Sequence, residues 1–93
     1  MNCVVGLDIG TTSTIGVVLN TLNHKIIFQS SRSVKLYSKK TGWAEEDPNQ
    51  WWLNTQSILN DIGFFSKNKK INICSIGVTG MLPALVILDK NNQ

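Results

Sequence analysis

Histidine and cysteine are nearly absent from this chain, which narrows the chemistry that it can carry out. His24 is the only histidine, so a histidine-based metal site or catalytic dyad would lack its partners, and we expect His24 to occupy a hairpin turn. The two cysteines, Cys3 and Cys74, lie far apart in the sequence, without the C-x-x-C spacing of metal and redox sites. Each falls within a predicted strand, where we expect a buried and reduced thiol.

Long apolar runs and strong charge are also missing. No apolar stretch approaches the ~20 residues that cross a bilayer, and the chain starts directly with a strand-like segment, without a basic leader or a cleavage site. These features predict a cytoplasmic protein with no membrane partner. The net charge is only +3. The basic clusters at 39–40 and 67–70 have no interleaved aromatic residues that would stack on bases, so they favour solvated loops over a nucleic-acid site.

The remaining composition, 42% hydrophobic and 16% charged, is typical of a small globular domain. Three apolar segments separated by turn residues, 2–8, 15–19 and 25–30, predict a three-stranded antiparallel meander. Residues 38–46 show no periodicity and contain a glycine, so a loop is expected there.

Asp47 and Pro48 predict the start of a helix, because Asp caps the first turn and proline fits the first helical position. The helix is expected to end near Gly63. Its apolar face should pack on the sheet, and we expect its two tryptophans to lie in the core or between domains rather than to bind a sugar. This face is formed by Trp51, Trp52, Thr55, Ile58, Leu59, Ile62 and Phe65.

A polar linker is expected over 66–70, followed by a strand over 71–79. A helical crossover of this length places the new strand parallel to strand 2–8. A last short strand is expected over 84–88. The predicted fold class is therefore α/β, with the element order β-β-β-α-β and a short terminal strand.

The turn between the first two strands carries the residues that indicate a function. Asp8 ends the first strand, and Gly10, Thr11, Thr12 and Ser13 follow in a tight turn. Consecutive backbone N–H groups in such a turn can form an anion-binding nest, the hydroxyl groups can donate to phosphoryl oxygens, and Asp8 can hold a partly hydrated Mg²⁺. The same residues also suit an ordinary hairpin turn, and neither a P-loop nor a G-x-G-x-x-G motif is present. The residues alone leave both interpretations open.

Three segments in order resemble the FGGY family of carbohydrate kinases. Residues 6–14, GLDIGTTST, are similar to the phosphate hairpin that the actin, Hsp70 and sugar-kinase superfamily shares. Residues 42–52, GWAEEDPNQWW, are similar to the family's G-W-x-E-Q-D-P-x-x-W-W segment, and 76–89 resemble its I-G-V-S-G-Q-M-H-G-L-V-L-L-D segment. The residues of these segments are most similar to those of the xylulose-kinase-like branch of the family.

This resemblance implies a partial ribonuclease H-like domain of the actin-like ATPase superfamily, in which residues 1–93 form an incomplete N-terminal part of the kinase's first domain. It implies ATP and Mg²⁺ as cofactors, and transfer of the γ-phosphoryl group to a hydroxyl of a sugar or polyol. Family members usually carry Lys or Arg where this chain has Ile15, so one direct charge contact to the phosphates is missing or supplied elsewhere. The residues that match the family's phosphate and metal hairpin are Asp8, Gly10, Thr11, Thr12 and Ser13. Among them, Asp8 matches the position that holds the Mg²⁺.

The sugar side of the family's site corresponds to the segment after Gly80, where xylulose kinases and their relatives offer Gln, Met and His. The matching residues here are Met81, Leu82 and Pro83, which are poor hydrogen-bond partners for a sugar hydroxyl. Xylulose is therefore not the favoured substrate, and another pentulose, a polyol or another sugar is equally open. Trp43 either closes over the substrate or covers the sheet edge.

No residue matches the family's catalytic Asp, which implies that the chain alone is inactive. Two alternatives remain at this point. A different phosphotransferase of the actin, Hsp70 and hexokinase superfamily would explain the hairpin but not residues 42–52. A non-catalytic, oligomerising role for the chain is the other. Strand 71–79 would lie at a sheet edge with an uncovered apolar face, so we expect a homo-oligomer. It would be joined through that edge, through the uncovered face or by exchange of the terminal strand 84–88.

Overall fold

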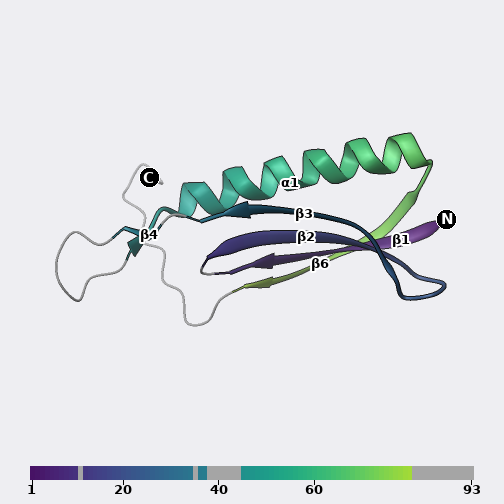
Figure 1. Cartoon of the computed structure of the whole chain (residues 1–93), viewed down its shortest axis with the longest axis horizontal. Coiled ribbons are helices and arrows are strands. Elements are labelled where there is room, and N and C mark those ends of the chain that lie inside the picture. The colour runs from purple at the N-terminus through teal and green to yellow at the C-terminus, as the bar shows by residue number, and fades with distance from the viewer. Residues whose placement is uncertain (11, 35, 38–44, 81–93) are drawn as a thin grey trace.

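A computed structural model describes residues 1–10, 12–34, 36–37 and 45–80. A four-stranded sheet with one helix along one of its faces makes up most of this structure (Figure 1). The elements in chain order are β1 (Asn2–Ile9), β2 (Ser13–Asn20), β3 (Ile26–Ser33), β4 (Leu36–Tyr37), β5 (Glu45–Glu46), α1 (Pro48–Lys69) and β6 (Asn72–Gly80).

The topology agrees with the predicted α/β class. The strand order in the sheet is β3-β2-β1-β6, in which β1, β2 and β3 form the antiparallel meander and β6 pairs parallel with β1. The short strands β4 and β5 pair with each other, so the loop predicted over 38–46 is wrong at residues 45–46. Residues 38–44 and the strand predicted over 84–88 lie outside the described residues.

Tight turns join the meander strands. The N–H of Gly10 donates to the carbonyl of Ser13 at 2.9 Å between β1 and β2, and the N–H of His24 donates to the carbonyl of Asn20 at 2.9 Å between β2 and β3. His24 has a left-handed backbone conformation, with φ of 60°. The prediction that His24 occupies a hairpin turn is therefore confirmed.

The core lies between α1 and the sheet, where the helix contacts β2 and β3 (Figure 1). Gly16 on β2 controls how closely the two layers approach. A Cβ at this position would overlap Ile58, and it would lie 3.1 Å from Cδ1 of Ile62 and 3.2 Å from Cδ2 of Leu7. The buried apolar side chains of this layer are Cys3, Val5, Leu7, Val18, Ile58 and Ile62.

The start of α1 agrees with the sequence. Pro48 is the first helical residue, and the carboxylate of Asp47 accepts a hydrogen bond from the N–H of Asn49 at 3.0 Å. Asp47 thereby satisfies one of the backbone donors that the first turn leaves without an intrahelical partner.

The end of α1 does not agree with the sequence. The helix passes through Gly63 and continues to Lys69, so the predicted linker over 66–70 is wrong. Phe65 in this last part stacks on Phe28 of β3, with ring centroids 4.4 Å apart. The contact holds the extra turns against the sheet. The C-cap residue Lys70, with a left-handed φ of 55°, ends the helix after Lys69.

The face of α1 toward the sheet is centred differently from the prediction. Trp52 is 61% exposed, so its expected place on the face that packs on the sheet is wrong, whereas the alternative that it lies between domains stays a prediction. Trp51 is half-buried. Asn54 is buried instead. Its amide donates to the carbonyl of Ser33 at 3.1 Å, and its side-chain oxygen accepts from the Gln50 side chain at 2.7 Å. Because both ends of the amide are paired, this polar residue can occupy a buried position.

A polar cluster also joins β3 to α1. One oxygen of Asp61 accepts a hydrogen bond from the Ser30 hydroxyl at 2.6 Å and forms an ion pair with Arg32 at 2.6 Å. The hydrogen bond from Ser30, which has the larger effect, and the one from Arg32 hold the pKa of Asp61 below its usual range. Both charged side chains are 38% exposed, so solvent screening keeps the contribution of the pair to stability small.

In the described part of the chain, β6 lies at the edge of the sheet next to β1 (Figure 1). Ile76 and Val78 are 53% and 61% exposed there. Cys74 is exposed at a register shift in the pairing of β1 with β6, so the predicted burial of this thiol is wrong, whereas Cys3 is buried as expected. Both cysteines are free.

Within the described part of the chain, α1 does not combine the length and apolar character that crossing a membrane would need.

Candidate functional site

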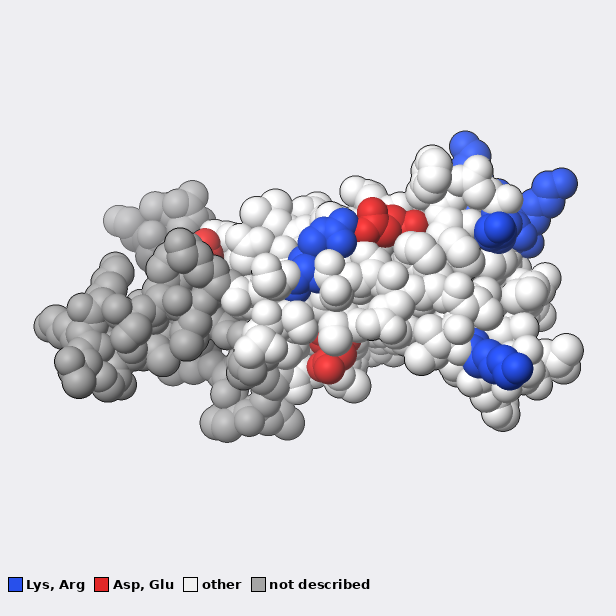
Figure 2. Space-filling model, viewed as in Figure 1, with Lys and Arg blue, Asp and Glu red and all other residues white. Residues whose placement is uncertain are grey.

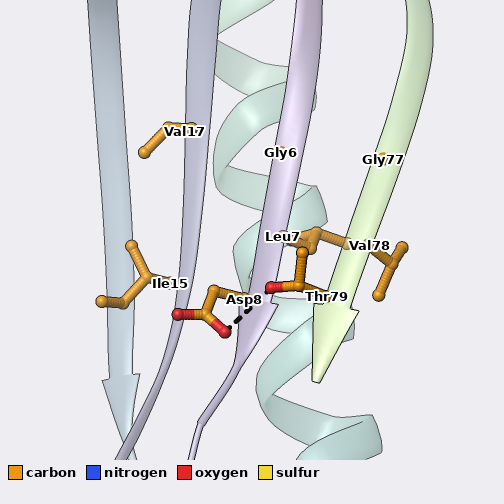
Figure 3. Close-up of a pocket in the computed structure, with 8 residues that line it drawn as sticks. All are labelled: Gly6, Leu7, Asp8, Ile15, Val17, Gly77, Val78 and Thr79. Carbon is orange, nitrogen blue, oxygen red and sulfur yellow. Dashed lines mark hydrogen bonds between the residues drawn. The ribbon is translucent and has the colours of Figure 1, made fainter. Parts of the chain in front are cut away.

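The carboxyl ends of β1 and β6 lie side by side and place Asp8 on the face of the sheet opposite α1 (Figure 3). The parallel pairing puts Asp8 next to Thr79, and the antiparallel pairing puts Ile15 next to Asp8 on its other side. Neighbouring residues across a ladder share one face of a sheet. The three side chains therefore form a row across β6, β1 and β2.

Two glycines beside this row leave a hollow in the surface of the sheet. Gly6 and Gly77 are paired across β1 and β6, and a Cβ at Gly77 would meet nothing within 4 Å. The hollow has a volume of about 440 Å³, within the range of ~300–1,000 Å³ found for ligand pockets. Its lining, drawn in Figure 3, is Gly6, Leu7, Asp8, Ile15, Val17, Gly77, Val78 and Thr79. The carboxylate of Asp8 and the hydroxyl of Thr79 give polar groups to an otherwise apolar surface.

Asp8 is exposed to solvent and has one fixed partner. Its Oδ1 accepts a hydrogen bond from the hydroxyl of Thr79 at 3.0 Å, and Figure 3 shows the other oxygen pointing away from Thr79. Sequence reasoning did not select Thr79. The partner of Asp8 depends on the register between β1 and β6, and the register shift near Cys3 changes that register in a way that the residue pattern does not reveal.

The predicted phosphate turn follows directly on the strand that carries Asp8. The turn favours glycine at position 10 for a steric reason, because a Cβ there would lie 3.1 Å from the carbonyl oxygen of Ser13. Thr12 is exposed, and its carbonyl accepts the N–H of Val34 at 2.9 Å, which ties the turn to the chain after β3. The structure thus brings Asp8, Gly10, Thr12 and Ser13 together at one end of the sheet.

The other predicted site residues lie outside the described part of the chain. They are Thr11, Trp43, Met81, Leu82 and Pro83.

Among the described residues, the lysines lie away from this end of the sheet. Figure 2 shows basic side chains at the end of the molecule where α1 finishes and β2 turns into β3, and the described lysines are Lys25, Lys67, Lys69 and Lys70. No Lys or Arg is among the residues that line the hollow, where Ile15 is the neighbour of Asp8. In the described ranges, no three His, Cys, Asp or Glu side chains gather as a metal-binding group. A cation at Asp8 would therefore take its further ligands from outside these described residues.

A comparison of the fold with solved structures defines the class of protein. The crystal structure of xylulose kinase from Rhodospirillum rubrum superposes with a TM-score of 0.87 and 43% sequence identity, covering 98% of this chain and 19% of that one. The four strands and the helix are thus part of the actin-like ATPase fold that these kinases share. This result confirms the fold class that the sequence resemblance implies.

The chain belongs to the FGGY family of carbohydrate kinases, because the model of the family's N-terminal domain matches residues 3–93. It is 29% identical over 93 residues to the xylulose kinase of Bacillus subtilis and 33% identical over 92 residues to the glycerol kinase of Leptospira biflexa. The chain spans 18% of the length of each of these relatives. Membership of this family excludes the alternative that the chain belongs to a different phosphotransferase of the actin, Hsp70 and hexokinase superfamily.

Proposed function

We propose that this chain is the N-terminal part of the first domain of an ATP-dependent carbohydrate kinase, which transfers the γ-phosphoryl group of Mg·ATP to a hydroxyl of a sugar or polyol in the cytoplasm. The observation that carries the proposal is the position of Asp8. In a chain of this family, an exposed carboxylate at the end of β1 lies directly before a tight turn rich in hydroxyl groups and beside an open hollow.

The donor set at this end of the sheet fits a magnesium–phosphate group. Mg²⁺ prefers one or two carboxylates and keeps several waters, and Asp8 has one oxygen that the bond to Thr79 does not use. The Thr11, Thr12 and Ser13 hydroxyls and the backbone N–H groups of the turn would bind phosphoryl oxygens. When bound, Mg²⁺ supplies charge neutralisation at the transferring phosphoryl group.

The residues of this chain would have different roles in phosphoryl transfer. Gly6 and Gly77 keep the surface beside Asp8 free of side chains, so that a bound group can approach the backbone closely. Asp8 and the turn orient the phosphates, which is a large part of catalysis in this class of reaction. Ile15 gives no charge contact, so the counter-charge must come from the metal or from other parts of the protein.

A catalytic base for the sugar hydroxyl is not assigned to this chain. Asp8 is next to the phosphate turn rather than at a substrate hydroxyl, and the chain spans only 18% of its relatives' length. We therefore expect the 93-residue chain alone to phosphorylate nothing. Met81, Leu82, Pro83 and Trp43 stand as candidate contacts to the sugar. The named relatives act on xylulose or on glycerol, so the proposal extends to a sugar or polyol and no further.

The activity test measures ADP release by the full-length protein that carries this chain, with Mg·ATP and a panel of pentuloses, polyols and sugar acids. We expect release that depends on one class of acceptor and on Mg²⁺, and no acceptor-dependent release by the 93-residue chain. The absence of acceptor-dependent release from the folded full-length protein across the panel would contradict the proposed function. Acceptor-dependent release by the short chain would show that it contains the base.

We also propose that the 93-residue chain self-associates through the edge of β6. Within the described residues no strand pairs with the outer edge of β6, which also carries Ile76 and Val78, 53% and 61% exposed. Strand edges with unpaired backbone groups pair with other chains. Sedimentation at micromolar concentration should give a dimer or a larger species. Val78→Lys should shift the chain toward the monomer, because lysine on an edge strand opposes pairing.

Leu22→Lys is the matched control for this experiment, since Leu22 is 90% exposed in the turn between β2 and β3. This variant adds the same charge far from the edge and should leave the association unchanged. A wild-type chain that sediments only as a 10.3 kDa monomer and binds no hydrophobic dye would contradict the proposal.

A further inference from the structure

The hydrogen bond between Thr79 and Asp8 joins residues that are 71 positions apart in the sequence, at 3.0 Å. The two residues are direct neighbours in the parallel pairing of β6 with β1. The bond therefore depends on the sheet itself and not on a local turn. Hydrogen-bond partners of this kind orient the side chains that bind metals, and Thr79 is placed to orient the Asp8 carboxylate.

The residues around Asp8 show why this task falls to Thr79. On the β2 side its neighbour is Ile15, which offers no hydrogen-bond donor. On the β6 side the previous residue of the same face is Gly77, which has no side chain. Among the residues that line the hollow, Thr79 is thus the one whose side chain donates to the carboxylate.

Threonine suits this position for a second reason. Its branched Cβ restricts the side-chain rotamer, so the hydroxyl has a defined direction even though Thr79 itself is exposed. The bond occupies Oδ1 of Asp8 and turns the second oxygen away from β6 (Figure 3). The second oxygen remains available to a ligand.

We propose that Thr79 is a positioning residue, which orients the carboxylate of Asp8 toward a magnesium–nucleotide group through this hydrogen bond. The inference rests on the proposed kinase function and adds a residue to it. Partners that orient a metal-binding side chain typically account for ~10–100-fold in metal affinity or activity. Because Asp8 would hold Mg²⁺ partly through water, the lower end of this range, about tenfold, is expected for loss of the hydroxyl.

The test compares Thr79→Val, which keeps the branched shape and removes the donor, with Thr79→Ser, which keeps the donor. In the full-length protein, calorimetry measures the binding of ADP with and without Mg²⁺. A second measurement gives kcat and the Mg²⁺ concentration for half-maximal rate. Thr79→Val should weaken Mg·ADP binding and lower kcat by about tenfold, while metal-free ADP binds as before. Thr79→Ser keeps the hydroxyl, so its Mg·ADP binding and kcat should be close to those of the wild type.

Two controls separate this role from a structural one. Ser75 lies on the same face of β6, four residues earlier in the strand, and Ser75→Val should leave Mg·ADP binding unchanged. In an Asp8→Asn background, Thr79→Val should cause no further loss, because the hydroxyl acts through the carboxylate. Thr79→Ala serves as a second variant if Val perturbs the edge strand.

The outcomes are distinguishable. If the wild-type protein phosphorylates an acceptor and Thr79→Val or Thr79→Ala binds Mg·ADP equally well, the role of Thr79 is overturned and the kinase function stands. An equal loss of metal-free ADP binding would also overturn it, because a structural role alone predicts that result. A wild-type protein with neither phosphoryl transfer nor metal-dependent ADP binding overturns both proposals.

Discussion

Asp8→Ala is expected to lower the turnover of the full-length kinase by on the order of 100-fold or more, the size of the loss when one preorganised charge-stabilising group is removed from an active site. The carboxylate ends β1 on the open face of the sheet, beside the phosphate turn and the hollow. We expect kcat to fall because the carboxylate would hold the metal that neutralises the transferring phosphoryl group. The measurement is the initial rate at saturating Mg·ATP and acceptor.

The fold should tolerate this change, because Asp8 is exposed and its carboxylate bonds to one exposed hydroxyl. Asp61→Asn is the matched control, since this carboxylate belongs to the cluster that joins α1 to β3. It should lower stability slightly and leave turnover near that of the wild type. Near wild-type turnover in Asp8→Ala at saturating Mg·ATP would remove the metal role from Asp8.

Gly16→Ala is expected to destabilise the chain by about 1–3 kcal/mol or more, the usual cost of overpacking a core. The added methyl group would overlap Ile58, which is fully buried, and would press on Ile62 and Leu7 at 3.1 and 3.2 Å. Each of these neighbours belongs to the core between α1 and the sheet, so the helix would have to move. The measurement is the free energy of unfolding from urea denaturation.

The same substitution at Gly63 provides the control with the opposite sign. Gly63 lies within α1, is exposed, and a Cβ there would meet nothing within 4 Å. Gly63→Ala should therefore stabilise the chain by about 0.5–1 kcal/mol through helix propensity. A Gly16→Ala variant as stable as the wild type would show that the layers can separate without cost.

The strands and the start of the helix follow from local patterns that sequence reasoning can detect. Apolar runs broken by turn residues located the meander, and Asp47 with Pro48 located the helix start, because capping chemistry is local. The parallel pairing of β6 with β1 followed from the length of the crossover. The candidate site was found in part for the same reason, since Asp8 and its turn are adjacent in sequence.

The errors arose where tertiary contacts outweigh local preference. The sequence pattern predicts that the helix ends near Gly63, but the helix continues to Lys69, where Phe65 stacks on Phe28 and stabilises the additional turns. Asn54 takes a buried place because its amide finds two partners across elements, which the pattern of apolar residues does not show. Thr79 went unnoticed for a related reason, because its contact with Asp8 exists only in the assembled register.

The parallel pairing of β6 with β1 has a consequence for how the protein folds. The meander strands pair with sequence neighbours through short turns, whereas the pairing of β6 with β1 closes a loop that contains all the elements between these two strands. The entropic cost of closing a loop grows as about (3/2)RT ln n. Such long-range pairing is slow relative to local contacts. Asp8 can therefore enter its strand early but meets the hydroxyl of Thr79, 71 residues away, only when β6 pairs with β1. The orientation of the carboxylate is thus a late product of folding rather than a property of the hairpin.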